Sequence, residues 1–116
     1  MNKFDLKKRA AIVTGGAQGF GLDIAKRFLK SGARVIIWDN DKNELKKLEK
    51  KIKKKNLYKQ MVDVTDPENV EDAVKKITKK MKIDILVNSA GITGSTTELW
   101  KYDYEEWKTI VDINLH

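Results

Sequence analysis

The sequence predicts an α/β fold built on a doubly wound parallel sheet, with helices on both faces. Short apolar, β-branched segments alternate along the chain with segments whose apolar residues recur at helical spacing. The connections between them are short, as expected for successive strands that run in the same direction. The expected strands are 10–14, 34–39, 57–64 and 83–87, and the expected helices are 19–31, 41–52, 66–81 and from about 103 toward the end.

Local signals define where two of these helices begin. Asp41 is a typical N-cap residue, and Glu44 three positions later completes the pattern of a capping box. Asp66 followed by Pro67 is the usual start of a helix, because Pro suits the first turn. Gly32 provides a stop for the helix that precedes it.

The composition excludes several classes of protein. With 116 residues the chain suits one domain, and 41% hydrophobic with 35% charged residues fits neither a disordered nor a membrane-spanning chain. The absence of cysteine excludes disulfides, thiolate metal sites and cysteine nucleophiles, and no metal site is expected. Because the N-terminus has no apolar core of a signal peptide, we expect a cytoplasmic protein.

The net charge of +7 raises the question of nucleic-acid binding. Only Arg9, Arg27 and Arg34 carry the bidentate fork that favours phosphate and base recognition, and all other basic residues are lysines. The densest lysine run, 46–59, contains apolar residues at helical spacing, which indicates the solvated side of an amphipathic helix. We therefore expect no specific nucleic-acid partner and no membrane contact.

The strongest chemical signal is a glycine-rich segment between the first strand and the first helix: Thr14-Gly15-Gly16-Ala17-Gln18-Gly19-Phe20-Gly21. A dinucleotide pyrophosphate requires close backbone approach and a helix N-terminus whose N–H groups face the anion. Gly15, Gly19 and Gly21 suit those needs, and the segment lacks the Gly-Lys-Ser/Thr ending of a triphosphate-binding loop. A purely structural glycine turn is the alternative.

An acidic residue follows at the expected place, since Asp39 ends the second strand. A carboxylate there can accept hydrogen bonds from the ribose hydroxyls of the adenosine and would repel a 2′-phosphate. Because Asn40 rather than Arg follows it, the sequence favours NAD over NADP. The alternative is an Asp that only forms a turn.

Taken together, these motifs resemble the N-terminal part of an ordinary short-chain dehydrogenase/reductase, over essentially all of residues 1–116. The glycine segment is similar to the cofactor motif of that family, and Asp63-Val64 resembles its adenine-contacting pair. Asn88-Ser89-Ala90-Gly91 resembles the family's Asn-Asn-Ala-Gly beside the cofactor, with Ser in place of the second Asn. Asn114 matches the helix asparagine of the catalytic tetrad.

The resemblance implies a Rossmann-like sheet of order 3-2-1-4 that ends in a truncated helix, with an unpaired edge at the fourth strand. It also implies a catalytic Ser, Tyr and Lys that would follow Asn114 and are not in this chain. Tyr104 and Lys108 have the family's Tyr-x-x-x-Lys spacing, but they precede Asn114, and we interpret the match as coincidence. The expected cofactor-binding residues are Thr14, Gly15, Gln18, Gly19, Phe20, Gly21, Asp39, Asp63, Val64, Asn88, Ala90 and Gly91.

The expected function is hydride transfer between NAD and a secondary alcohol or ketone, carried out by the full-length protein. The substrate would be a 3-oxoacyl thioester or a sugar, polyol or hydroxy acid, and the resemblance implies a homodimer or homotetramer. The chain alone would be an incomplete cofactor-binding domain. A catalytically inactive nucleotide-binding half-domain is the main alternative, and a lysine-rich structural or nucleic-acid-associated protein is another.

Overall fold

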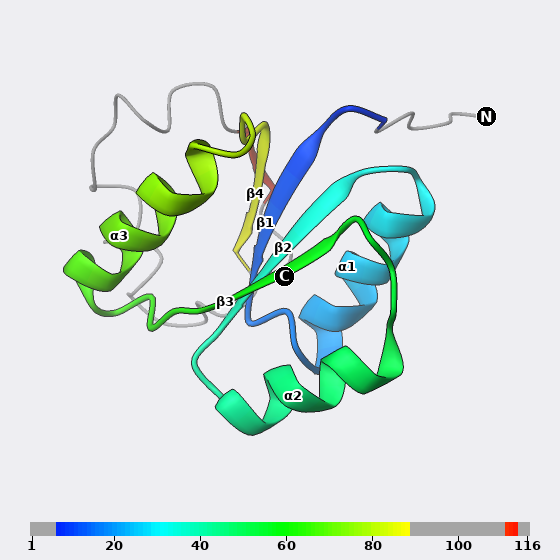
Figure 1. Cartoon of the computed structure of the whole chain (residues 1–116), viewed down its shortest axis with the longest axis horizontal. Coiled ribbons are helices and arrows are strands. Elements are labelled where there is room, and N and C mark those ends of the chain that lie inside the picture. Colours follow the sequence, from blue (N-terminus) through cyan, green and yellow to red (C-terminus); the bar gives the residue numbers. More distant parts are fainter. Residues whose placement is uncertain (1–6, 89–110, 114–116) are drawn as a thin grey trace.

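A computed structural model of the chain describes residues 7–88 and 111–113. From β1 to β4 the elements alternate as predicted, and a further strand follows: β1 (Ala10–Thr14), α1 (Gly19–Lys30), β2 (Arg34–Asp39), α2 (Lys42–Lys51), β3 (Leu57–Met61), α3 (Pro67–Thr78), β4 (Ile85–Asn88) and β5 (Val111–Ile113). The strands form one parallel sheet with the order β3-β2-β1-β4-β5 (Figure 1). This confirms the α/β fold and the predicted order of the first four strands.

Two apolar layers cover the sheet, one on each face. Val13, Val35 and Ile37 point into a cluster with α1 and α2, which lie on the same face. Ile12, Ile36 and the other residues of alternate register point into a second cluster, which α3 covers on the opposite face (Figure 1). Because both faces of the central strands are covered, β1 is buried along its whole length, which explains why its sequence is almost entirely apolar.

The helix starts confirm two of the sequence signals. The Asp41 side chain accepts hydrogen bonds from the N–H groups at the start of α2, and Asp66 does the same for α3, whose first residue is Pro67. Gly32 follows the end of α1 with a φ of +95°, a conformation that glycine adopts without strain. In the described part of the chain, no helix has both the length and the apolar character required to span a membrane.

Two strand boundaries differ from the prediction. β3 ends at Met61 rather than at residue 64, because the Asp63 side chain accepts hydrogen bonds from the backbone N–H and the hydroxyl of Thr65 and turns the chain. β4 begins at Ile85 and includes Asn88, so this asparagine ends a strand instead of beginning a loop. The shift places Asn88 opposite Thr14 of β1 in the sheet register.

The expected C-terminal helix is wrong at residues 111–113. This segment is β5, which pairs in parallel with β4, so the outer edge of β4 is not left open as predicted. The β-branched residues Val111 and Ile113 flank Asp112, an alternation of period two that suits a strand, and pairing satisfies the backbone groups of an otherwise exposed edge. Residues 103–110 and 114–116 of the expected helix lie outside the described residues.

Candidate nucleotide-binding site

The glycine-rich loop leaves β1 and is held by the neighbouring strand. The backbone N–H of Gly15 donates to the carbonyl oxygen of Trp38 at 2.7 Å, and that of Gly16 donates to the same oxygen at 3.3 Å. Gly15 has a φ of +63°, which lets the chain turn away from the sheet without a steric penalty. One carbonyl of β2 therefore fixes the path of the loop toward α1.

Gly16, which was not among the predicted site residues, occupies a position that requires glycine. A Cβ atom at this position would lie 2.8 Å from Cδ1 of Ile37 and 3.0 Å from the carbonyl oxygen of Val13. Only glycine fits there without a shift of the core, because the second contact is to backbone. The Gly15-Gly16 doublet was the signal, since two adjacent glycines indicate more than one positional requirement.

The N-terminus of α1 differs from the N-termini of α2 and α3. Its N-cap residue is Gln18, whose side chain makes no capping hydrogen bond, and its first turn contains no acidic residue. α2 and α3 are both capped by an aspartate and carry a glutamate in the first turn. The N-cap and the first turn of α1 therefore bring no carboxylate to its N–H groups and positive dipole end, which suits an anionic ligand.

Space is also present at this helix end. A Cβ atom at Gly19, where φ is +62°, would meet no atom of the described residues within 4 Å. Phe20 beside it is 55% exposed, which is unusual for so large an apolar side chain, whereas Gly21 is buried inside the first turn. Gly15, Gln18, Gly19, Phe20 and Gly21 thus surround an open helix N-terminus, and the residues fit the diphosphate of a dinucleotide.

Asp39 ties the glycine-rich loop to the start of α2. Its side chain is 8% exposed, and its Oδ2 atom accepts a hydrogen bond from the N–H of Ala17 at 3.2 Å. Its Oδ1 atom accepts from the N–H of Asp41 at 3.0 Å. Asp39 ends β2, as predicted, and its hold on the loop is a contact that no sequence pattern indicated.

The expected capping box of α2 is only half formed. Because the N–H of Asp41 donates to Asp39, the Glu44 side chain does not close the box and lies 3.3 Å from the ammonium of Lys47. Asp41 still caps the helix with its own carboxylate. The prediction was wrong on this reciprocal bond, because the Asp39 carboxylate, two residues earlier, accepts the N–H of Asp41 in a local turn.

Thr14 and Asn88 meet at the carboxyl ends of β1 and β4. The Thr14 hydroxyl donates to Oδ1 of Asn88 at 3.0 Å, and both side chains are buried. This contact joins two residues that are far apart in sequence at the same edge of the sheet as the glycine-rich loop. The structure therefore brings together these two predicted residues and Asp39 at one edge.

Asp63 and Val64 follow β3 at the same edge. The N–H of Val62 donates to the carbonyl oxygen of Asp39, which places this turn next to the end of β2. Hydrogen bonds from the hydroxyl and the N–H of Thr65 lower the pKa of Asp63. The Val64 side chain packs against the apolar cluster under α3. Of the other predicted residues, Ala90, Gly91 and Asn114 lie outside the described residues.

The comparisons with known proteins show the family of this chain. Residues 9–116 match the model of a family described as short chain dehydrogenase. The chain is 37% identical over 109 residues to a 2-dehydro-3-deoxy-L-rhamnonate dehydrogenase (NAD(+)) of a Sphingomonas strain. This match covers 93% of the chain and 43% of the relative. It is 38% identical over 114 residues to a 3-oxoacyl-acyl-carrier-protein reductase of Chlamydia muridarum.

A third relative is the 3alpha-hydroxysteroid dehydrogenase of Mediterraneibacter gnavus, 36% identical over 117 residues. The last two matches each cover 95% of the chain and 46% of the relative, so the chain spans less than half the length of these relatives. The match to the family model extends from the residue before β1 across every motif described above. The chain belongs to the short chain dehydrogenase family.

Proposed function

We propose that this chain is the cofactor-binding part of an NAD-dependent oxidoreductase, which transfers a hydride between the nicotinamide and a secondary alcohol or ketone. The observation that carries the proposal is the N-terminus of α1, which has no side-chain cap and opens at Gly19 beside the carboxylate of Asp39. Bound there, the dinucleotide would supply the hydride donor or acceptor that protein side chains lack.

Each part of the dinucleotide has residues that suit it. The N–H groups in the first turn of α1, which begins at Gly19, would hold the diphosphate, with Gln18 and Phe20 at the rim. Gly15, whose own N–H is bound to Trp38, would turn the chain away from the ligand. Asp39 would accept hydrogen bonds from the adenosine ribose, and Asp63 with Val64 would border the adenine. Thr14 and Asn88 would form the wall at the centre of the sheet, next to Ala90 and Gly91.

Charge supports NAD over NADP as the cofactor. Asp39 and Asp41 lie at the end of β2, and Asp63 and Asp66 lie at the adjacent end of β3. A 2′-phosphate on the ribose would add negative charge next to these carboxylates, at a distance where Coulomb repulsion is not fully screened. The 2-dehydro-3-deoxy-L-rhamnonate dehydrogenase among the relatives carries NAD(+) in its name.

The relatives indicate a class of substrate. Their names describe a sugar-acid dehydrogenase, a hydroxysteroid dehydrogenase and a 3-oxoacyl-acyl-carrier-protein reductase. These reactions interconvert a secondary alcohol and a ketone, and we propose the same for the complete protein. Asn114 would act in its proton relay, and the resemblance implies a Ser, Tyr and Lys in the part of the relatives that this chain does not span. We also propose that the complete protein forms a homodimer or homotetramer.

The test is to follow reduced nicotinamide by absorbance while the complete protein is offered NAD⁺ with sugar acids, polyols, hydroxysteroids and 3-hydroxyacyl thioesters. We expect turnover with at least one of these alcohols. Gly19→Ala should abolish turnover because its Cβ fills the open space at α1. Gly32 also has a positive φ, and a Cβ there would lie 2.9 Å from Cγ of Lys7, so Gly32→Ala should lose stability. Because Gly32 lies at the other end of the same helix, this variant should retain turnover and so controls for the strain of a positive φ. Cofactor binding without turnover on any alcohol or ketone would support an inactive nucleotide-binding protein instead.

A further inference from the structure

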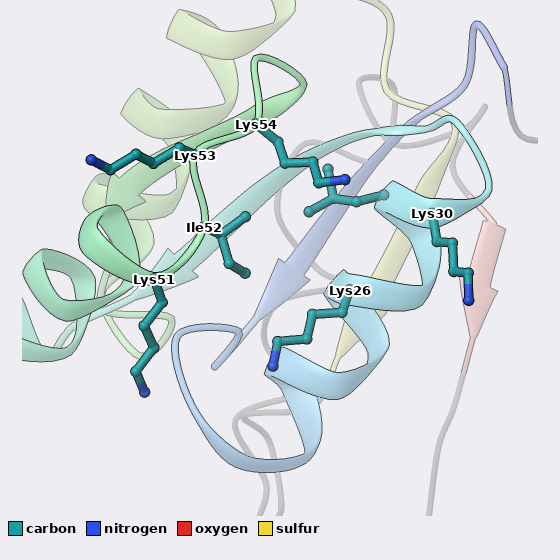
Figure 2. Close-up of a pocket in the computed structure, with 7 residues that line it drawn as sticks. Lys26, Lys30, Lys51, Ile52, Lys53 and Lys54 are labelled. Atoms are coloured by element: carbon teal, nitrogen blue, oxygen red, sulfur yellow. The ribbon is translucent and has the colours of Figure 1, made fainter.

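A cavity lies away from the candidate nucleotide site, between the carboxyl-terminal parts of α1 and α2 (Figure 2). It has a volume of about 430 Å³ and is open to solvent. Because α1 begins at Gly19 in the nucleotide site and ends at Lys30, this cavity is at the opposite end of the helix. We call it the lysine hollow, after the lysines that line it: Lys26, Lys30, Lys51, Lys53 and Lys54.

The floor of the lysine hollow is aliphatic. Leu29 of α1 and Ile52, which follows α2, both line it, and both are half-buried against the apolar cluster on this face of the sheet. Figure 2 shows the Ile52 side chain in the middle of the cavity, with Lys26 on the α1 side and Lys51 on the other. The hydrocarbon stems of the lysines extend this apolar surface up to their charged ends.

The positive charge of the hollow is not balanced within the described residues. None of its five lysines forms an ion pair there; the lysine–carboxylate pairs found in this part of the chain are Lys47–Glu44 and Lys59–Glu49. The ammonium groups of Lys51, Lys53 and Lys54 also point in different directions (Figure 2). A single phosphate could not reach all of them, whereas a ligand with several spaced negative charges could.

We propose that the lysine hollow docks an acidic peptide segment of a partner protein, with one aliphatic side chain of the peptide placed between Leu29 and Ile52. Lys26 and Lys30 are four residues apart on α1, so their Cβ atoms lie about 6 Å apart. Carboxylates two residues apart in an extended peptide are separated by about 7 Å, which matches that spacing. The peptide supplies both the missing charge and a side chain for the apolar floor.

The lining favours a peptide over other polyanions. Nucleic-acid sites use arginine forks and aromatic rings that stack on bases, and the residues of the hollow include neither. Anionic membranes are bound by apolar side chains that protrude into the lipid, whereas Leu29 and Ile52 are recessed and half-buried. An acidic peptide with an aliphatic residue complements the charge and the floor together.

The test measures binding of a fluorescent peptide, Asp-Glu-Asp-Leu-Glu-Asp-Glu, to the complete protein by anisotropy. The variant Lys26→Glu/Lys53→Glu/Lys54→Glu reverses charge at the hollow. The matched control, Lys76→Glu/Lys79→Glu/Lys80→Glu, makes the same change in net charge at the end of α3, on the opposite face of the sheet. A second peptide carries Ser in place of Leu, which probes the apolar floor without altering the protein.

We expect the hollow variant to bind the leucine peptide about tenfold more weakly, because three exposed ion pairs are lost, and the control variant to bind it as the parent does. The serine peptide should bind the parent more weakly than the leucine peptide. Equal weakening by both variants, or equal binding of both peptides, would reduce the effect to net charge and overturn the proposal. The proposal would also be overturned if an oligothymidylate or phosphatidylserine vesicles bound the parent more tightly than the leucine peptide does, and if the hollow variant abolished that binding.

Discussion

Replacing Asp39 by alanine should weaken both the fold and cofactor binding, because this carboxylate holds the glycine-rich loop. The Ala17 N–H that donates to it belongs to a residue only 3% exposed, so in Asp39→Ala this donor stays buried without its acceptor. A hydrogen bond to a charged group contributes about 1.5 to 3 kcal/mol. The Asp41 N–H lies on an exposed residue and can be hydrated, so its loss adds little. The expected loss is therefore about 2 to 3 kcal/mol in the free energy of unfolding.

Urea unfolding followed by circular dichroism measures this loss, with the slope of the transition compared between variants to confirm that they unfold alike. Asp39→Asn is the matched control, since its amide oxygen can still accept one hydrogen bond, and we expect about half the loss in stability. Both variants should bind NAD⁺ more weakly. In Asp39→Asn the affinities for NAD⁺ and NADP⁺ should also become more similar, because the negative charge that repels the 2′-phosphate is removed. An Asp39→Ala protein with the parent's urea midpoint and NAD⁺ affinity would refute this account of the loop.

Three further predictions concern the same edge and the far end of the sheet. Gly16→Ala should lower the free energy of unfolding more than Gly19→Ala does, because a Cβ at position 16 would overlap Ile37 and the backbone. Gly19→Ala should lose about 1 kcal/mol through its positive φ and, in addition, its nucleotide affinity. Urea midpoints measure the first effect and NAD⁺ titration measures the second. Thr65→Ala should raise the pKa of Asp63 toward its ordinary 3.8, whereas Thr65→Ser should not, and NMR titration measures both. Because the pKa of Asp63 is lowered in the folded protein, its contribution to the free energy of unfolding is present above pH 3.8 and is lost as the pH falls through the folded pKa. Asp84→Ala should cost about 2 kcal/mol in urea unfolding, because this buried carboxylate accepts the N–H of Ala10 at 3.0 Å; a loss below about 0.5 kcal/mol would contradict that role.

The sequence predicted the fold because each element has a strong local signal. The apolar runs of β1 and β2, the helical spacing after Gly19 and the caps at Asp41 and Asp66 act within a few residues, and the structure has these elements where they were expected. The strand order came from the resemblance rather than from such signals. The end of β3 was misplaced because the hydrogen bonds between Asp63 and Thr65 override the β pattern.

Contacts between residues far apart in sequence were beyond prediction from local patterns. The hydrogen bond from the N–H of Ala17 to Asp39, 22 residues later, depends on how the loop after β1 lies over the end of β2. The requirement for glycine at position 16 likewise comes from Ile37 on a neighbouring strand. The segment 111–113 was expected to be helical because its apolar residues fit both periods, and its pairing with β4 decides between them.

The central claim is that the open N-terminus of α1 and Asp39 together hold a dinucleotide. Calorimetric titration of the complete protein with NAD⁺ and with NADP⁺ tests it most directly. We expect binding at one site per chain, tighter for NAD⁺ than for NADP⁺. Gly19→Ala should abolish this binding, whereas Gly32→Ala, which is strained by its positive φ but lies at the other end of α1, should lose stability and keep the binding. A folded protein that binds neither dinucleotide, or one whose affinity Gly19→Ala leaves unchanged, would contradict it.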